Sequence, residues 1–241
     1  MQELSKNPSW LLRKAVQAFY KERYKTAKRL ACIENLRNPN DYFTLCWYAN
    51  ALYFSGAHND QKAASLYMRA IEINPSHPLA HGGLGRIHYT NALRIIREYR
   101  IVPGDPDIMF ADELSPTDDR QETCIRVKGF ADYECGNREI AIEELKRATD
   151  LVDDADDKVE LLCMAAELLA EMNNKTGIKA FKEILEIDLN YVPAHFHLAG
   201  CYAATGQHEL ALQEYEFVKD NAPKMATDLS TLLANYNVDV P

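Results

Sequence analysis

Histidine side chains are the first candidates for chemistry in this sequence. His77 and His81 lie four residues apart, and His195 and His197 are separated by a single residue. Zinc in proteins takes three or four ligands, and neither pair has a third ligand nearby in the sequence. The HExxH motif does not occur. We therefore expect these histidines to pack in the interior or to lie at the surface, and we expect no bound metal.

Acidic side chains are concentrated between Asp150 and Glu160, which makes this run the second candidate for metal binding. The run lacks the glycine and the D-x-D-x-D-G spacing of a calcium-binding EF-hand loop. Asp156 and Asp157 precede a helix predicted to begin near Lys158, where negative charge stabilises the helix N-terminus. We therefore interpret the run as a helix start and not as a metal site.

Sequence motifs of common enzymes are missing. There is no GxxxxGK[ST] phosphate loop, no GxGxxG after a strand and no GxSxG nucleophile elbow. Carboxylates are plentiful, but none stands alone on an apolar helix face as a tuned acid or base would. The sequence therefore predicts a protein that is not an enzyme and that needs no cofactor.

The charge of the chain is unevenly distributed. Of a net charge of −9, residues 1–30 carry +6, because eight basic side chains outnumber two acidic ones, and the remaining residues carry −15. An acidic bulk disfavours nucleic acid, since neutralising phosphates needs a positive field. The basic segment suits an acidic partner, a phosphate or an anionic membrane, although a solvated helical face is the simpler interpretation.

The apolar runs and the cysteines bear on the compartment of the protein. No apolar run approaches the roughly 20 residues that span a bilayer, and Met1 to Pro8 does not read as a signal peptide. The six cysteines form no CxxC pair, and most fall within apolar helical patterns, so we expect buried, reduced thiols. The sequence therefore predicts a soluble, cytoplasmic protein without a membrane span.

The chain is built from a recurring segment in which small, aromatic and turn residues return at matching offsets. Two segments show this most clearly, with Trp47, Ala51, Phe54, Ala63, Tyr67, Ala70 and Pro75 in one and Leu198, Ala199, Tyr202, Ala211, Tyr215 and Pro223 in the other. The segments cover residues 8–41, 44–77, 78–111, 122–155, 158–191 and 192–225. Fixed spacing of this kind indicates stacked structural repeats.

The pattern resembles the tetratricopeptide repeat, whose consensus is W-x2-L-G-x2-Y, then A-x3-F, then P. The resemblance covers nearly the whole chain and implies an all-α fold, a right-handed α-solenoid of stacked antiparallel helix pairs. It implies one domain over residues 1–241, because a single repeat cannot bury its own apolar face. An amphipathic helix over residues 225–236, with Leu229, Leu232 and Leu233, is expected to cap the end of the stack.

Two kinds of side chain are expected to hold the helices together. Small residues on the first helix of each pair permit close approach, namely Ala51, Gly85, Gly129, Ala165 and Ala199. Aromatic residues are expected to fill the space between neighbouring repeats, namely Phe54, Tyr67, Phe181, Tyr202 and Tyr215. Turn residues such as Thr205 and Gly206 are expected to end the first helices.

The third segment departs from the period. Its first helix is predicted from Pro78 to Tyr89, and a second helix is compatible with residues 91–100. Residues 101–119 then form an acidic, proline-containing insertion that adds ten residues to the period. The apolar triplet at residues 108–110 either docks on the protein's own surface or contacts a partner.

Candidate partner-binding residues follow from the resemblance, because in this family the first helices line a concave surface. Helical phase selects residues of the first helices that are neither the close-packing small residues nor the inter-repeat aromatic residues. About half of the selected residues are expected to pack in the core instead of facing the groove. They are Tyr48, Leu52, Arg86, Tyr89, Arg126, Phe130, Tyr133, Phe196 and His197, together with Leu162. Aromatic residues and arginine are enriched at protein–protein hot spots.

These residues predict a protein-interaction scaffold or adaptor that binds a partner peptide or helix in its concave groove. Some relatives clamp a C-terminal carboxylate with lysine and asparagine, but only Arg126 among the corresponding positions suits that chemistry, which favours an apolar segment as the ligand. The alternative is a structural subunit or self-associating building block of a larger assembly. A third hypothesis is a regulatory piece of an enzyme with chemistry in residues 101–119.

Overall fold

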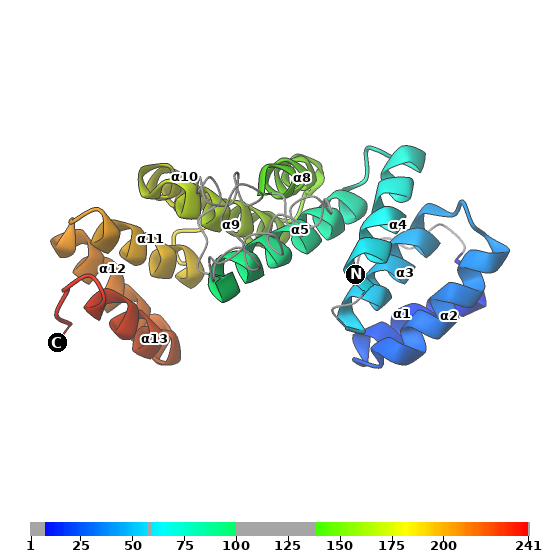
Figure 1. The fold of residues 1–241 in the computed structure, drawn as a ribbon, viewed down its shortest axis with the longest axis horizontal. Helices are drawn as coiled ribbons and strands as arrows, with labels where there is room; N and C mark the ends of the chain where they lie inside the picture. Colours follow the sequence, from blue (N-terminus) through cyan, green and yellow to red (C-terminus); the bar gives the residue numbers. More distant parts are fainter. Residues whose placement is uncertain (1–7, 57–58, 100–137, 241) are drawn as a thin grey trace, which may run out of the picture. The chain divides into compact units, whose positions relative to one another are not determined.

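A computed structural model of the protein describes residues 8–56, 59–99 and 138–240. Within these ranges the backbone forms eleven α-helices and no strand, which confirms the all-α prediction (Figure 1). The helices are α1 (Trp10–Tyr20), α2 (Tyr24–Arg37), α3 (Tyr42–Phe54), α4 (Asp60–Ile73), α5 (Pro78–Tyr99), α8 (Arg138–Leu151), α9 (Ala155–Met172), α10 (Asn174–Ile187), α11 (Val192–Ala204), α12 (His208–Asn221) and α13 (Pro223–Ala234).

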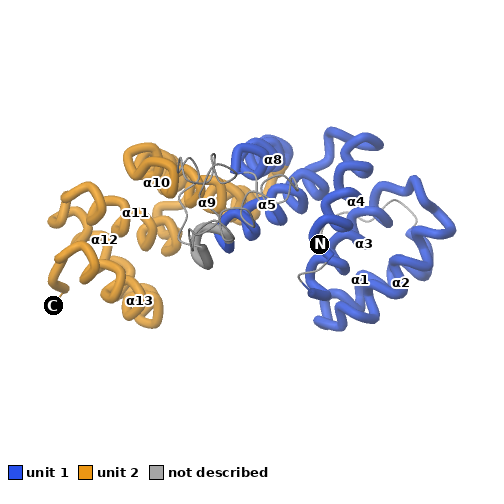
Figure 2. The backbone as a smooth tube through the Cα atoms, viewed as in Figure 1, with its two compact units in different colours: residues 1–151 blue, residues 152–241 orange. Residues whose placement is uncertain are grey.

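The helices form two compact units, residues 1–151 and residues 152–241 (Figure 2). In unit 1 the helices pair as α1 with α2, α3 with α4, and α5 with α8, and each pair packs on the next. In unit 2, α9 pairs with α10 and α11 with α12, and α13 packs on this last pair. Consecutive helix pairs stacked in this way are the organisation of an α-solenoid. One domain spanning both units stays a prediction.

Capping residues explain where several helices begin and end. The Asp41 carboxylate accepts a hydrogen bond from the backbone N–H of Thr44 at the start of α3. The Asp154 carboxylate does the same for α9, which begins three residues earlier than predicted. Gly206 has a positive φ of 76° after the end of α11, a conformation that glycine adopts without strain, so this predicted helix stop is confirmed.

The predicted packing residues are mostly buried. The small residues Ala51, Ala165 and Ala199 are buried on the first helices, whereas Gly129 lies outside the described residues. Buried aromatic residues fill the interior as predicted, namely Tyr67, Phe181, Tyr202 and Tyr215. Phe54 also packs between neighbouring pairs, against Phe19 and Tyr24 of the first pair, although its side chain stays 42% exposed at the end of α3.

A capping helix closes the C-terminal stack, as predicted. Helix α13 begins at Pro223, two residues before the predicted start, and packs against α11 and α12. Leu229 and Leu233 are fully buried in the core of unit 2, and Leu232 packs against its edge. The outer face of α13 carries exposed polar side chains such as Thr227 and Asp228, as expected for a cap.

The third helix pair differs from the prediction. Pro78 to Tyr99 forms the single helix α5, whereas the sequence predicts two helices over residues 78–89 and 91–100. No glycine or proline lies between Tyr89 and Tyr99 to end the helix, and Ala92 and Leu93 are buried along it. The predicted insertion at residues 101–119 lies outside the described residues.

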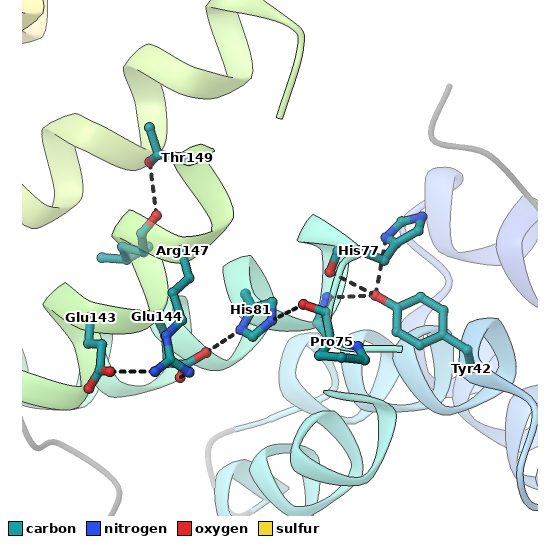
Figure 3. A network of polar contacts seen from close by, with 10 residues as sticks. Tyr42, Pro75, His77, His81, Glu143, Glu144, Arg147 and Thr149 are labelled. Carbon is teal, nitrogen blue, oxygen red and sulfur yellow. Dashed lines mark hydrogen bonds and ion pairs between the residues drawn. The ribbon is translucent and has the colours of Figure 1, made fainter. Parts of the chain in front are cut away.

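Helix α8 is the partner of α5. A Cβ atom built on Gly85 would lie 2.8 Å from Leu145 Cγ and 3.0 Å from the Leu145 backbone nitrogen, so the two helices touch where glycine leaves room. His81 Nδ1 lies 2.6 Å from Glu144 Oε2 of α8, and His81 Nε2 lies 3.0 Å from the Pro75 carbonyl oxygen (Figure 3). Leu145 is thus the α8 residue that packs on Gly85, the small residue of α5.

The same polar arrangement, a histidine between a glutamate and a backbone carbonyl, occurs in unit 2. The comparison shows which residues of α8 and α12 occupy equivalent positions. His195 Nδ1 lies 2.5 Å from Glu214 Oε2 of the partner helix, and His195 Nε2 lies 2.9 Å from the Leu189 carbonyl oxygen. Each histidine follows its carbonyl by six residues, but the histidine and glutamate are 19 residues apart in unit 2 and 63 in unit 1.

The spacing from the histidine to the glutamate is therefore 44 residues longer in the third pair than in the last pair. Helix α8, which lies in the second half of the predicted repeat 122–155, packs on α5. The bounds of that repeat stay a prediction. Residues 122–137 of that predicted repeat lie outside the described residues.

Candidate functional site

Two of the predicted groove residues, Tyr48 and Leu52, lie on α3 and are buried, with 5% and 3% of their surface exposed. Both belong to the main core cluster of unit 1, and the Lys62 ammonium lies 5.5 Å from the centre of the Tyr48 ring. Burial raises the pKa of the Tyr48 hydroxyl above its usual value. Their predicted place on an open groove is therefore corrected, since α3 is turned so that these side chains pack in the interior.

Arg86 and Tyr89 lie on α5 and are partly exposed. The neighbouring Thr90 hydroxyl lies 2.8 Å from the Tyr53 hydroxyl, a contact that ties α5 to α3. Burial keeps the pKa of Tyr67 well above its usual value, and the nearby Arg86 charge opposes this shift. Helix α5 thus places Arg86 and Tyr89 within reach of solvent.

Phe196 and His197 lie on α11 of unit 2 and are also partly exposed. The His197 ring stacks on the buried Phe181 ring, with centroids 5.3 Å apart and planes inclined by 9°, and Phe196 packs edge-on against His197. His197 Nε2 lies 3.3 Å from Glu167 Oε1 of α9. Leu162, the other candidate on α9, packs against the core of unit 2. These contacts hold His197 in one orientation.

Three further predicted groove residues, Arg126, Phe130 and Tyr133, lie outside the described residues, so their place in a groove stays a prediction. Unit 1 brings Arg86 and Tyr89 together on α5, and unit 2 brings Phe196 and His197 together on α11. Partner binding by these four partly exposed residues is likewise a prediction.

Sequence reasoning identified the basic charge of the first helix pair but missed the aromatic side chains that share its surface. Phe19 forms its floor, with its ring centroid 5.3 Å from Tyr24, 5.4 Å from Trp47 and 5.2 Å from Phe54. Trp10 and Tyr20 are 63% and 60% exposed on α1. We define the aromatic–basic surface as these rings and the cations beside them, namely Trp10, Arg13, Lys14, Phe19, Tyr20, Lys21, Arg23, Tyr24, Lys25 and Phe54. A signal was present in the sequence, because Trp10, Arg13, Lys14, Gln17 and Lys21 follow helical spacing on one face of α1.

Three buried thiols and one buried histidine are held in their neutral forms. Burial raises the pKa of the Cys46 and Cys163 thiols to about 12 and that of Cys201 to about 11. Burial lowers the pKa of His88 to about 4, so its imidazole is neutral at pH 7. A thiol with a raised pKa is a poor nucleophile.

Within residues 8–56, 59–99 and 138–240, no cluster of three or more His, Cys, Asp or Glu side chains could hold a metal ion. None of the helices described is both long enough and apolar enough to cross a membrane.

The described helices define a repeat protein of the α-solenoid class, and the chain has the tetratricopeptide-repeat fold. The thermophilic TPR protein TTC0263 from Thermus thermophilus is 20% identical, with 95% of this chain and 98% of that chain covered and a TM-score of 0.53. MamA is 13% identical, with 96% of each chain covered and a TM-score of 0.56.

A third solved structure, YrrB, is described as a TPR protein with an unusual peptide-binding site. It is 15% identical, with 87% of this chain and 93% of that chain covered and a TM-score of 0.50. No protein-family model matches the sequence, and neither does any curated protein. At these identities the likeness concerns the fold.

Proposed function

We propose that the protein is an interaction scaffold whose first helices receive an extended or helical segment of a partner protein. The observation that carries the proposal is the presence of partly exposed side chains on first helices, the Arg86 guanidinium with the Tyr89 ring on α5 and the Phe196 and His197 rings on α11. Arginine and aromatic residues supply much of the binding energy at protein interfaces. The peptide-binding site of YrrB supports a ligand of this kind.

The side chains favour a segment with apolar groups over a bare carboxylate terminus. A carboxylate clamp needs several cationic or amide donors, whereas Tyr89 and Phe196 offer rings and Arg86 offers a single guanidinium. His197 is already in contact with Glu167, which makes it a poor anion receptor. A cytoplasmic location fits the free thiols of Cys46, Cys163 and Cys201.

Site-specific photo-crosslinking tests the proposal. A benzophenone amino acid is introduced in place of Tyr89 or Phe196, and in a control at the exposed Ser65 of α4. After irradiation in native extract, we expect discrete adducts from the first two positions, and mass spectrometry identifies the partner. Adding Arg86→Ala to the Tyr89 variant is expected to weaken that adduct.

Adducts of equal yield at Ser65, or none at Tyr89 and Phe196 in folded protein, would contradict the groove assignment. A subunit role in a larger assembly is the second candidate. Light scattering of the purified chain separates the two, because a self-associating building block grows in mass with concentration whereas an adaptor does not.

A further inference from the structure

The exposed face of α1 is unusual for a helix that faces solvent. Trp10 and Tyr20 are among the most exposed large apolar side chains of the described residues. They share this face with Arg13, Lys14 and Lys21, all exposed, and the Lys14 ammonium lies 6.0 Å from the centre of the Trp10 ring. Aromatic rings and basic side chains thus share one side of the helix, so a ligand on this face contacts both kinds of side chain.

A preformed aromatic platform continues this face at the end of α1. The Tyr24 and Phe54 rings stack with centroids 5.4 Å apart, and both pack against Phe19. The turn between α1 and α2 is tight, because the backbone N–H of Glu22 donates to the Phe19 carbonyl at 2.8 Å and that of Arg23 to the Ala18 carbonyl at 2.9 Å. The rings are therefore held in place before any ligand arrives, which lowers the entropy cost of binding.

The charge on this helix pair is strongly one-sided. Residues 8–30 hold seven basic side chains and one acidic side chain, Glu22. The next two acidic residues along the chain already have hydrogen-bond partners. Glu34 is buried and accepts a hydrogen bond from Asn38 at 2.6 Å, and Asp41 caps α3. In the described part of the chain no carboxylate forms an ion pair with Arg13, Lys21, Arg23 or Lys25. These cations lack an internal counter-charge.

We propose that the aromatic–basic surface of the first helix pair binds a short acidic segment of a partner protein that carries an aromatic or large apolar side chain. The apolar side chain packs on Tyr20, Tyr24 and Phe54, and the flanking carboxylates pair with Lys21 and Arg23. None of these residues belongs to the predicted groove residues, so this surface is additional to the one proposed at Arg86, Tyr89, Phe196 and His197 and does not depend on it.

A second copy of the chain is a poor occupant of this surface. Two copies meeting through it would bring together two segments of charge +6. The outer face of α13 is a poor apolar counterpart, since it presents Lys224, Thr227, Asp228 and Thr231 to solvent. A nucleic acid fits less well than a peptide, because the chain has a net charge of −9 and its excess of cations is confined to this first pair.

Fluorescence anisotropy with designed peptides tests the proposal on the full-length protein. The probe is a labelled peptide of aspartate and glutamate with interspersed phenylalanine. Matched peptides replace phenylalanine by serine, or the acids by their amides. We expect Tyr20→Ser to raise the Kd about tenfold and Lys21→Gln with Arg23→Gln to raise it about three- to tenfold, with the second effect fading at high salt. Trp10→Ser provides an independent variant of the aromatic side.

Matched changes elsewhere serve as controls, namely Tyr236→Ser and Lys179→Gln, both at exposed positions of unit 2, and they are expected to leave the Kd unchanged. The proposal is overturned if the serine peptide binds as tightly as the phenylalanine peptide, or if the Lys21 and Arg23 changes have no effect. Tighter binding of single-stranded oligothymidylate than of the peptide would also overturn it, as would a concentration-dependent dimer that Tyr20→Ser abolishes.

Discussion

Replacing Gly85 with alanine tests how α5 and α8 pack against each other. In a helix interior, alanine is more favourable than glycine by roughly 1 kcal/mol. Here the added Cβ would lie 2.8 Å from Leu145 Cγ and 3.0 Å from its backbone nitrogen, so α8 has to move. Overpacking of this kind costs about 1–3 kcal/mol. We therefore expect Gly85→Ala to destabilise the protein by about 1 kcal/mol in spite of the gain in helix propensity.

A double-mutant cycle isolates the contact. Leu145→Ala alone removes a fully buried side chain and is expected to cost about 2–5 kcal/mol. With the leucine side chain gone, the contacts of the added Cβ with the side chain of residue 145 are relieved and only the backbone nitrogen remains, 3.0 Å away, so Gly85→Ala in this background is expected to be less destabilising. The coupling energy between the two changes is expected to be about 1–2 kcal/mol. It is measured from urea denaturation of the four proteins by far-ultraviolet circular dichroism.

Gly200→Ala is the matched control, because its Cβ would approach only the flexible end of Leu232, at 3.1 Å. There the propensity term is expected to dominate and the protein to be unchanged or slightly stabilised. If the effects of Gly85→Ala and Leu145→Ala simply add, within about 0.5 kcal/mol, the close packing of α8 on α5 is refuted.

Three further changes probe the interior and a helix start. Phe181→Ala removes a fully buried ring and is expected to lower the free energy of unfolding by about 3–5 kcal/mol in urea titration, and a loss below about 1 kcal/mol would contradict its burial. Asp154→Ala deprives the N–H groups of Asp156 and Asp157 of their acceptor and is expected to cost about 1 kcal/mol in thermal denaturation, where an unchanged midpoint would argue against capping. His88 is buried with a pKa lowered from 6.5 to about 4, so the unfolded chain gains a proton before the folded one as the pH falls. Stability is therefore lost between pH 6.5 and 4, by about 1.4 kcal/mol per pH unit from this group, and His88→Gln is expected to flatten that slope, whereas parallel slopes would refute the assignment.

Most helix boundaries were predictable because their causes are local. Pro75 and Pro223 mark the ends of second helices, and Gly206 marks the end of a first helix, as the sequence predicts. The third pair was not predictable by counting residues, because Leu145 and its neighbours fit the pattern of a second helix equally well in either of two pairs. The contacts of Leu145 with Gly85 and of Glu144 with His81 show that α8 packs on α5.

The candidate surfaces were predictable only in part. Helical phase places Tyr48 and Arg86 on first helices, but it does not say how each helix is rotated against its neighbours, and Tyr48 proved to be buried while Arg86 is not. Phe54 was assigned to inter-repeat packing because of its repeat position. Its neighbours Phe19 and Tyr24 are 35 and 30 residues away in the sequence, so the exposed platform they form has no local pattern.

The 38 residues that separate α5 from α8 bear on the order in which the protein folds. The other pairs close through one to five connecting residues, so their helices meet almost as soon as they form. The entropy lost on bringing two segments together rises with the number of residues between them, by about 0.6 kcal/mol per doubling, which amounts to about 2 kcal/mol for three doublings. We expect the α5–α8 contact to form late, so that weakening it speeds unfolding far more than it slows folding.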